Sequence, residues 1–161
     1  MVNKPKSIGT AAETAVRNYL LSIGFGPHEA HRNVLSGSQD QGDVWLRHPI
    51  RGLIVFEVKG GQAAKTASHE QCEKWLRDAE IEARNASGRL GVLVTQRAGV
   101  GVKNAGKWWC YFDGNTIGPT ITLPVGRNTR LETLPPGLTF RVTLAEFMAI
   151  MNVRLGEHVP A

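Results

Sequence analysis

The chain has 161 residues, 42% of them hydrophobic, which is enough for one full core and too little for two. No window approaches the roughly 18 uncharged apolar residues of a membrane span, and the first six residues lack a secretory signal, so we expect a cytoplasmic protein without a membrane partner. The 19 Lys and Arg residues outnumber the 14 Asp and Glu residues, and the net charge of +5 favours a polyanionic partner, with nucleic acid the first candidate.

The first predicted element is a helix from Gly9 to Ile23, where apolar residues fall on one helical stripe. Thr10 is its expected N-cap and Gly24 its stop. A short strand is expected within Glu29–Leu35. The polar, glycine-rich stretch Ser36–Gly42 is expected to be a loop.

A hairpin follows, with strands over Asp43–Arg47 and Ile54–Lys59 and a turn that contains proline and glycine. A symmetric turn pairs residues whose numbers sum to about 100, which sets Asp43 opposite Glu57 at roughly 4.5–5.5 Å between Cβ atoms. Because side chains alternate along a strand, Glu57 and Lys59 emerge on one face. Two carboxylates this close repel unless they are protonated or bridged by a cation such as Mg²⁺ or Mn²⁺.

The next segment, 60–67, is expected to be a linker of small residues. A second helix is predicted to begin near Ser68, since apolar residues at helical spacing extend to Ala83. Residues 91–95 are predicted to form an internal strand, and residues 108–112 another.

The segment from 113 to about 137 is expected to be irregular, with at most a strand at Ile121–Leu123, before a last helix over Thr143–Asn152. We therefore divide the chain into a core over 1–112 and a loop-rich extension over 113–161 that packs on the same domain. The two cysteines of the chain, Cys72 and Cys110, form no metal or disulfide pattern and are expected to be reduced core thiols.

Four features together carry a resemblance to a known family: Gly9-x-x-x-Glu13, Gly37-Ser38-x-x-x-Gly42-Asp43, Glu57-Val58-Lys59 and a following helix with Gln71. The set resembles the PD-(D/E)xK nuclease superfamily, and within it the archaeal-type Holliday junction resolvases and their phage-encoded relatives, over about residues 6 to 96. The resemblance implies an α/β fold with a restriction-endonuclease-like core of order α-β-β-β-α-β and a central mixed sheet flanked by helices. Proline often precedes the aspartate in the superfamily, whereas Gly42 stands there in this chain.

The resemblance implies a Mg²⁺-dependent DNA endonuclease, with Mn²⁺ as a substitute. Asp43 and Glu57 would hold one or two metal ions, with the backbone carbonyl of Val58 as a further ligand. Glu13 would reach the metal directly or through water. Lys59 would orient or deprotonate the attacking water, or stabilise charge on the phosphate; the residues leave these roles open.

Two further positions have a site role and a structural alternative. Ser38 would touch the phosphate or order its loop, and Gln71 would line the cleft. However, Gln71 follows Ser68 at the spacing of a capping box, and Glu13 follows Thr10 in the same way.

Basic residues are candidates to contact the DNA backbone, since neutralising phosphates supplies most nonspecific affinity; they are Arg32, Arg47, Arg51, Lys65, Arg97, Lys103 and Lys107. The glycine-rich stretch from Arg97 to Lys107 is a candidate for a mobile clamp over DNA. Trp108 and Trp109 could stack on bases, although adjacent residues on a strand face opposite ways and one should be core.

Branched DNA is the expected substrate and a homodimer the expected assembly, in the host cytoplasm if the chain is phage-encoded. Two alternatives stay open: a nuclease acting on single-stranded, flap or end DNA, and a DNA-binding module without catalysis.

Overall fold

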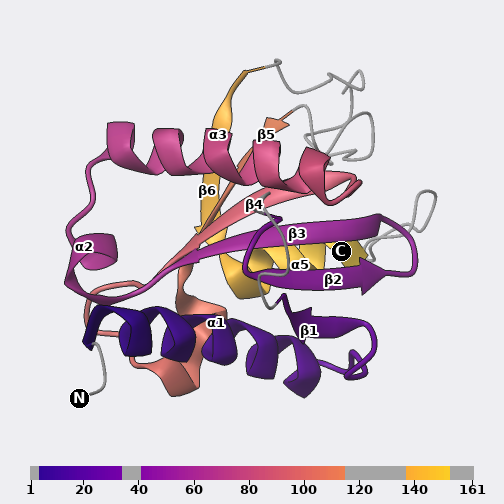
Figure 1. Cartoon of the computed structure of the whole chain (residues 1–161), viewed down its shortest axis with the longest axis horizontal. Helices are drawn as coiled ribbons and strands as arrows, with labels where there is room; N and C mark the ends of the chain where they lie inside the picture. Colours follow the sequence, from indigo (N-terminus) through magenta and orange to yellow (C-terminus); the bar gives the residue numbers. More distant parts are fainter. Residues whose placement is uncertain (1–3, 34–40, 115–136, 153–161) are drawn as a thin grey trace, which may run out of the picture.

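A six-stranded sheet forms the centre of the fold, with its strands in the order β1-β2-β3-β4-β5-β6 (Figure 1). The structure, a computed structural model, describes residues 4–33, 41–114 and 137–152. Strands β3 and β4 run parallel, and the other neighbouring pairs are antiparallel. The strands are β1 Ala30–Arg32, β2 Val44–His48, β3 Gly52–Lys59, β4 Leu90–Thr95, β5 Trp109–Asp113 and β6 Thr139–Thr143.

Helices cover both faces of this mixed sheet, as expected for an α/β fold. Helix α3 lies over one face and α1 over the other (Figure 1). No helix among the described residues is long and apolar enough to cross a membrane. The helical segments are α1 Lys4–Ser22, α2 Gly61–Lys65, α3 His69–Asn85, the 3-10 helix η1 Val102–Lys107 and α5 Leu144–Asn152.

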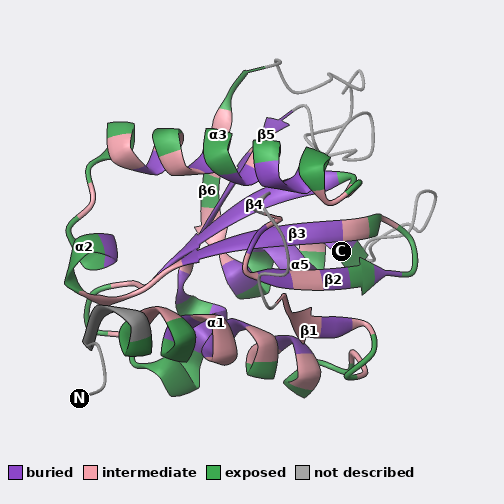
Figure 2. Cartoon of the chain, in the orientation of Figure 1, coloured by how far each residue is buried: buried purple, intermediate pink, exposed green. Residues whose placement is uncertain are grey.

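The main apolar core lies between the sheet and the pair α1 and α5. It joins Val16 of α1, Phe56 of β3 and Phe147 of α5, and the rings of Phe56 and Phe147 meet edge to face. A smaller cluster on the opposite face joins α3 to the sheet through Leu76 and Leu93. Figure 2 shows buried residues running along β3 and β4, the two central strands.

The predicted hairpin is confirmed, and so is its register. Strands β2 and β3 pair residues whose numbers sum to 100, from Val44 with Phe56 to His48 with Gly52. Asp43 lies one residue before the paired segment, where its backbone N–H donates to the carbonyl of Phe56 at 3.0 Å. It therefore lies at the end of the paired strands, opposite Glu57 in the register of the hairpin but beyond the last paired residue, Val44.

The start of the first helix is wrong in the sequence prediction. Helix α1 begins at Lys4, so Thr10 lies in its interior and accepts a hydrogen bond from the Thr14 hydroxyl at its backbone carbonyl, 2.7 Å away. Pro5 suits the first turn of a helix because its missing N–H would have no partner there. Thr10 therefore caps nothing, and the capping-box alternative for Glu13 is excluded.

Three other elements differ from expectation. The first strand, β1, spans only Ala30–Arg32, and residues 34 and 35 lie outside the described part. The expected linker contains the short helix α2. Strand β6 was not predicted, because its alternating polar residues are only half-buried and its pairing with β5 joins distant parts of the chain.

Residues of the expected C-terminal extension pack against the rest of the chain. Strand β6 extends the sheet beside β5, and α5 contributes Leu144, Phe147, Met148 and Met151 to the main core. The expected strand at 121–123 lies outside the described residues. The predicted helix starts are confirmed for α3, where the Ser68 hydroxyl accepts from the Gln71 N–H, and for α5 within one residue.

Candidate active site

A cleft of about 510 Å³ opens beside the C-terminal end of β3, next to α1 and α2. Five of its lining residues were predicted from the sequence: Glu13, Asp43, Glu57, Val58 and Lys59. A larger groove of about 760 Å³ follows α1 and η1, but none of the described residues that line it is a carboxylate. The first cleft therefore gathers the charged residues that could do chemistry.

The local backbone fixes the direction of Asp43. Its side-chain Oδ2 accepts a hydrogen bond from the Val58 N–H at 2.8 Å, so the carboxyl spans from one hairpin strand to the other. Gly42 precedes it with φ of +79°, and a Cβ there would lie 2.3 Å from Val55. Glycine is needed at this position because both the left-handed backbone and the close approach exclude a side chain.

Burial raises the pKa values of the two carboxyl groups of the hairpin, Asp43 and Glu57. Glu57 is 6% exposed on the α3 face of the sheet. Burial, followed by repulsion from Glu57, raises the pKa of Asp43 to about 8, although the Val58 hydrogen bond opposes the rise. Burial also raises the pKa of Glu57 to about 7, against the opposing effect of Lys59. Without an added cation, this site holds protons near neutral pH.

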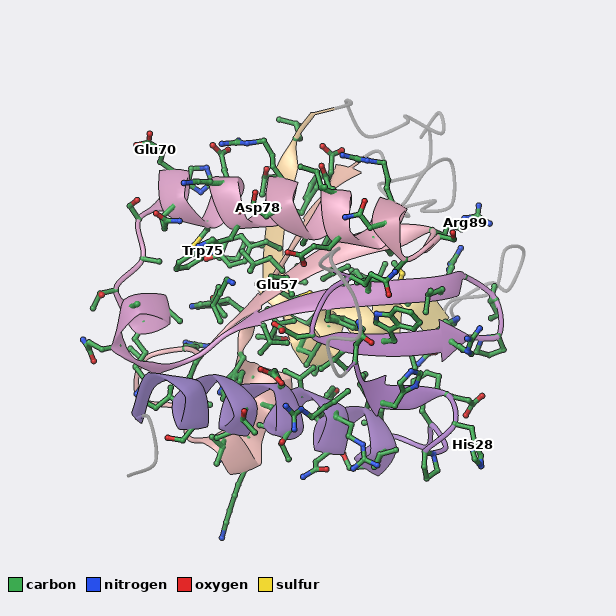
Figure 3. The ribbon with its side chains drawn as sticks, in the orientation of Figure 1. His28, Glu57, Glu70, Trp75, Asp78 and Arg89 are labelled. Atoms are coloured by element: carbon green, nitrogen blue, oxygen red, sulfur yellow. The ribbon has the colours of Figure 1, made fainter. Side chains whose placement is uncertain are left out.

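Lys59 supplies the positive charge of the site. Its ammonium forms an ion pair with Glu57 and lies 5.9 Å from the ring centroid of Trp75 on α3. Burial alone lowers the pKa of Lys59, but the Glu57 carboxylate, with smaller effects from Asp43 and Glu82, outweighs it and raises the pKa. Figure 3 shows Trp75 and Glu57 in the layer between α3 and the sheet.

Glu13 reaches the cleft from the interior of α1 but already has a partner. The Nε of Arg32 on β1 donates to Glu13 Oε2 at 2.9 Å, and a second donor nitrogen of Arg32 contacts the same oxygen. Glu13 still contributes to the raised pKa of Asp43 by repulsion. Arg32, expected to contact DNA, is thus held by a carboxylate of the site.

Glu82 on α3 is a buried carboxylate that sequence reasoning missed. It is 8% exposed, and its hydrogen bond with Glu57 contributes to the raised pKa of that residue. A signal was present, because Glu82 stands three residues after Ala79 on the buried stripe of the helix. A charge on such a stripe indicates a buried acid with a partner.

One predicted residue, Gln71, does not line the cleft, and another, Ser38, cannot be placed relative to it. Gln71 is absent from its lining, and its backbone N–H donates to Ser68 Oγ at 3.2 Å in the first turn of α3. This hydrogen bond is one half of the capping box that the spacing of Ser68 and Gln71 indicated, so the structural alternative for Gln71 is supported at its backbone N–H. Ser38 lies outside the described residues.

The basic candidates separate into several groups. Arg47 is exposed on β2, and Arg51 donates from Nε to the Met151 carbonyl at 3.1 Å. Lys103 and Lys107 are exposed on η1, and Lys65 and Arg97 line a second pocket.

Part of the expected clamp from Arg97 to Lys107 is packed against the protein, at Ala105 and Gly106, while most of its other residues are exposed. Ala105 is buried in the main core, and Gly106 lies so close to Tyr19 of α1 that a Cβ would be 2.5 Å from its ring. The role of this segment as a clamp over DNA stays a prediction. The two tryptophans divide as expected, with Trp108 fully buried and Trp109 half-buried, and both cysteines are free and buried.

The donor chemistry of the cleft fits a hard divalent cation. Within residues 4–33, 41–114 and 137–152, no three His, Cys, Asp or Glu side chains form a group that could hold a metal ion. A cation here would depend on Asp43 and Glu57, with the Val58 carbonyl and water completing its ligands. Mg²⁺ commonly binds through one or two carboxylates and keeps several waters. Its charge would also favour the ionised form of both acids.

No protein-family model, no curated protein and no solved structure matches the chain. Function must therefore be inferred from the chemistry of the cleft.

Proposed function

We propose that the protein is a divalent-metal-dependent DNA endonuclease with a restriction-endonuclease-like core. The observation that carries the proposal is a pair of carboxyls, buried Glu57 and half-buried Asp43, whose pKa values are raised and which share a cleft with the Lys59 ammonium. Folding gains nothing from two repelling acids in one buried site. A cation-binding role accounts for both.

The residues of the cleft have distinct roles in this proposal. Asp43 and Glu57 hold Mg²⁺ or Mn²⁺ with the Val58 carbonyl, and the bound ion would activate water and neutralise phosphate charge. Lys59, ion-paired with Glu57, supplies positive charge that would stabilise negative charge on the phosphate oxygens. Glu13, oriented by Arg32, adds negative potential beside Asp43.

DNA is the proposed substrate on the basis of the net charge of +5 and the chemistry of the cleft. The resemblance to Holliday junction resolvases adds branched DNA and a homodimer to the proposal. Symmetric cutting of a four-way junction needs two active sites related by a two-fold axis.

The test is cleavage of labelled four-way junction, flap, single-stranded and linear duplex DNA, with Mg²⁺ and with chelator. We expect Mg²⁺-dependent, symmetric nicks in the junction. Asp43→Asn and Glu57→Gln should each lower the rate at least about 100-fold, while DNA affinity persists because neither residue supplies positive charge. Asp78→Asn, on the exposed surface of α3, is the matched control and should cut normally.

The outcomes separate the proposal from its alternatives. Cutting of single strands, flaps or ends alone would retain the metal-dependent chemistry but reject the junction. Tight DNA binding without cutting, unchanged by either carboxylate substitution, would show a non-catalytic binding module. Cutting that survives in chelator or in both variants would reject the proposed site.

A further inference from the structure

A second pocket, of about 250 Å³, lies on the other side of α2 from the cleft. Lys65 of α2, Arg97 after β4 and Arg141 of β6 line it, together with Trp109 and Tyr111 of β5. We call it the arginine pocket. Its three cations come from segments far apart in the sequence, so the fold gathers them.

The ring of Trp109 contacts both arginines of the pocket. The guanidinium of Arg97 lies 4.3 Å from the centre of the Trp109 ring, and that of Arg141 lies 4.7 Å from it. Arg141 also interacts with the Tyr111 hydroxyl. These contacts hold the planar groups in fixed places, which favours bidentate binding of an oxyanion.

The charges of the arginine pocket are not balanced by acids. No Asp or Glu lines it, and none of its three cations forms an ion pair with a carboxylate in the described part of the chain. Like charges gathered on one pocket repel each other. A bound anion would relieve that repulsion, and its phosphate-like geometry would match the arginine forks.

Strand pairing places this pocket on the same face as the cleft. Glu57 pairs with Leu93, Leu93 with Tyr111 and Tyr111 with Arg141, so the four residues form one row across β3 to β6. Three strand spacings of about 4.8 Å separate the backbones of Glu57 and Arg141 by roughly 14 Å. A nucleic-acid strand advances about 3.4 Å per nucleotide along the axis of a duplex and also winds around it, so this separation corresponds to only a few nucleotides of one strand.

We propose that the arginine pocket binds a second phosphate group of the DNA strand whose backbone is cut in the cleft. The inference rests on the proposed nuclease function and adds a positioning site a few nucleotides from the cut. Its ligand is a phosphate oxyanion, either an internal phosphodiester or a terminal phosphate. Arg97 and Arg141 are positioning residues, since they do not touch the reacting atoms.

The test measures binding without cutting, by fluorescence anisotropy in chelator. The probes are a short labelled single strand with a 5′-phosphate, one with a 3′-phosphate and one with neither. Arg97→Gln and Arg141→Gln should each weaken binding about 5- to 30-fold and lower the salt dependence by the equivalent of about one phosphate contact. Thermal unfolding checks that each variant is folded.

Arg89→Gln is the matched control, because Arg89 precedes β4 at its opposite end from Arg97. Figure 3 shows Arg89 far from Trp75 and Glu57. Its loss should change affinity less than twofold. An equal loss of DNA affinity in Arg89→Gln and in the pocket variants would mean that the arginines act only through nonspecific charge. Unchanged affinity in both pocket variants would mean that the arginines only cover Trp109. Either result overturns the proposal.

The three probes identify the source of the phosphate. Equal losses on all of them indicate an internal phosphodiester, whereas a loss confined to one phosphorylated end indicates a terminal phosphate. Failure of the nuclease proposal is distinguishable, because the wild type would then cut no DNA while the pocket variants still lost affinity. If the wild type cuts and the pocket variants bind normally, the pocket inference alone fails.

Discussion

Asp43 and Glu57 are the residues at which burial and charge conflict most directly. Both belong to a hairpin whose apolar residues Val44, Leu46, Ile54 and Phe56 are core, and both hold their protons to unusually high pH. The nearby backbone N–H of Val58 and the Lys59 ammonium offset only part of the cost. Such strained acids commonly mark functional sites.

This conflict predicts how stability depends on pH without metal. An acid whose pKa is raised from 3.8 to about 8 by folding binds more protons when folded between those values, so stability falls as pH rises through that window. Asp43→Asn removes the charge, and its gain in unfolding free energy over the wild type should grow from near zero at pH 4 to about 2–4 kcal/mol at pH 8.

Chemical denaturation in chelator at several pH values measures this difference. Asp78→Asn, on the exposed face of α3, should show no such growth with pH. A gain for Asp43→Asn that stayed constant between pH 4 and pH 8 would mean that Asp43 is an ordinary ionised residue.

At the scale of elements, the sequence predicted the site better than the outer parts of the fold. Alternation of apolar residues around a compact turn determined the hairpin register, which brings Asp43 beside Glu57 and Lys59. Ser68 marked the start of α3 because its hydroxyl caps the helix locally. Strand β6 and the ion pair between Glu13 and Arg32 depend on long-range contacts, which local patterns do not report.

The junction between the loop and β2 provides an element-scale prediction. Gly42→Ala should destabilise the protein by about 2–4 kcal/mol. Alanine disfavours the left-handed backbone at this position, and its Cβ would lie 2.3 Å from the Val55 side chain. Gly99→Ala is the matched control, since Gly99 has φ of +76° but no atom within 4 Å of an added Cβ. This substitution should lower the free energy of unfolding by only about 1 kcal/mol. Equal losses in denaturation midpoints would contradict the packing of Gly42.

The cleft and the arginine pocket are both built on the central sheet. Glu57 of the cleft shares the α3 face of the sheet with Tyr111 and Arg141 of the arginine pocket, and α3 packs over Leu93 between them, while the core with α1 and α5 lies on the other face. Acidic and basic sites are thus held at a fixed separation by strand pairing. A rigid sheet suits the positioning of a charged polymer against a metal.

The most direct test of this account is calorimetric titration of Mg²⁺ and Mn²⁺ into the protein at pH 7.5, in two buffers of different ionisation enthalpy. We predict that the wild type binds the ion and releases roughly one proton, because Asp43 and Glu57 are partly protonated at that pH. Asp43→Asn and Glu57→Gln should each bind at least about tenfold more weakly. Absence of divalent binding by the wild type, or equal binding by all three proteins, would contradict the account.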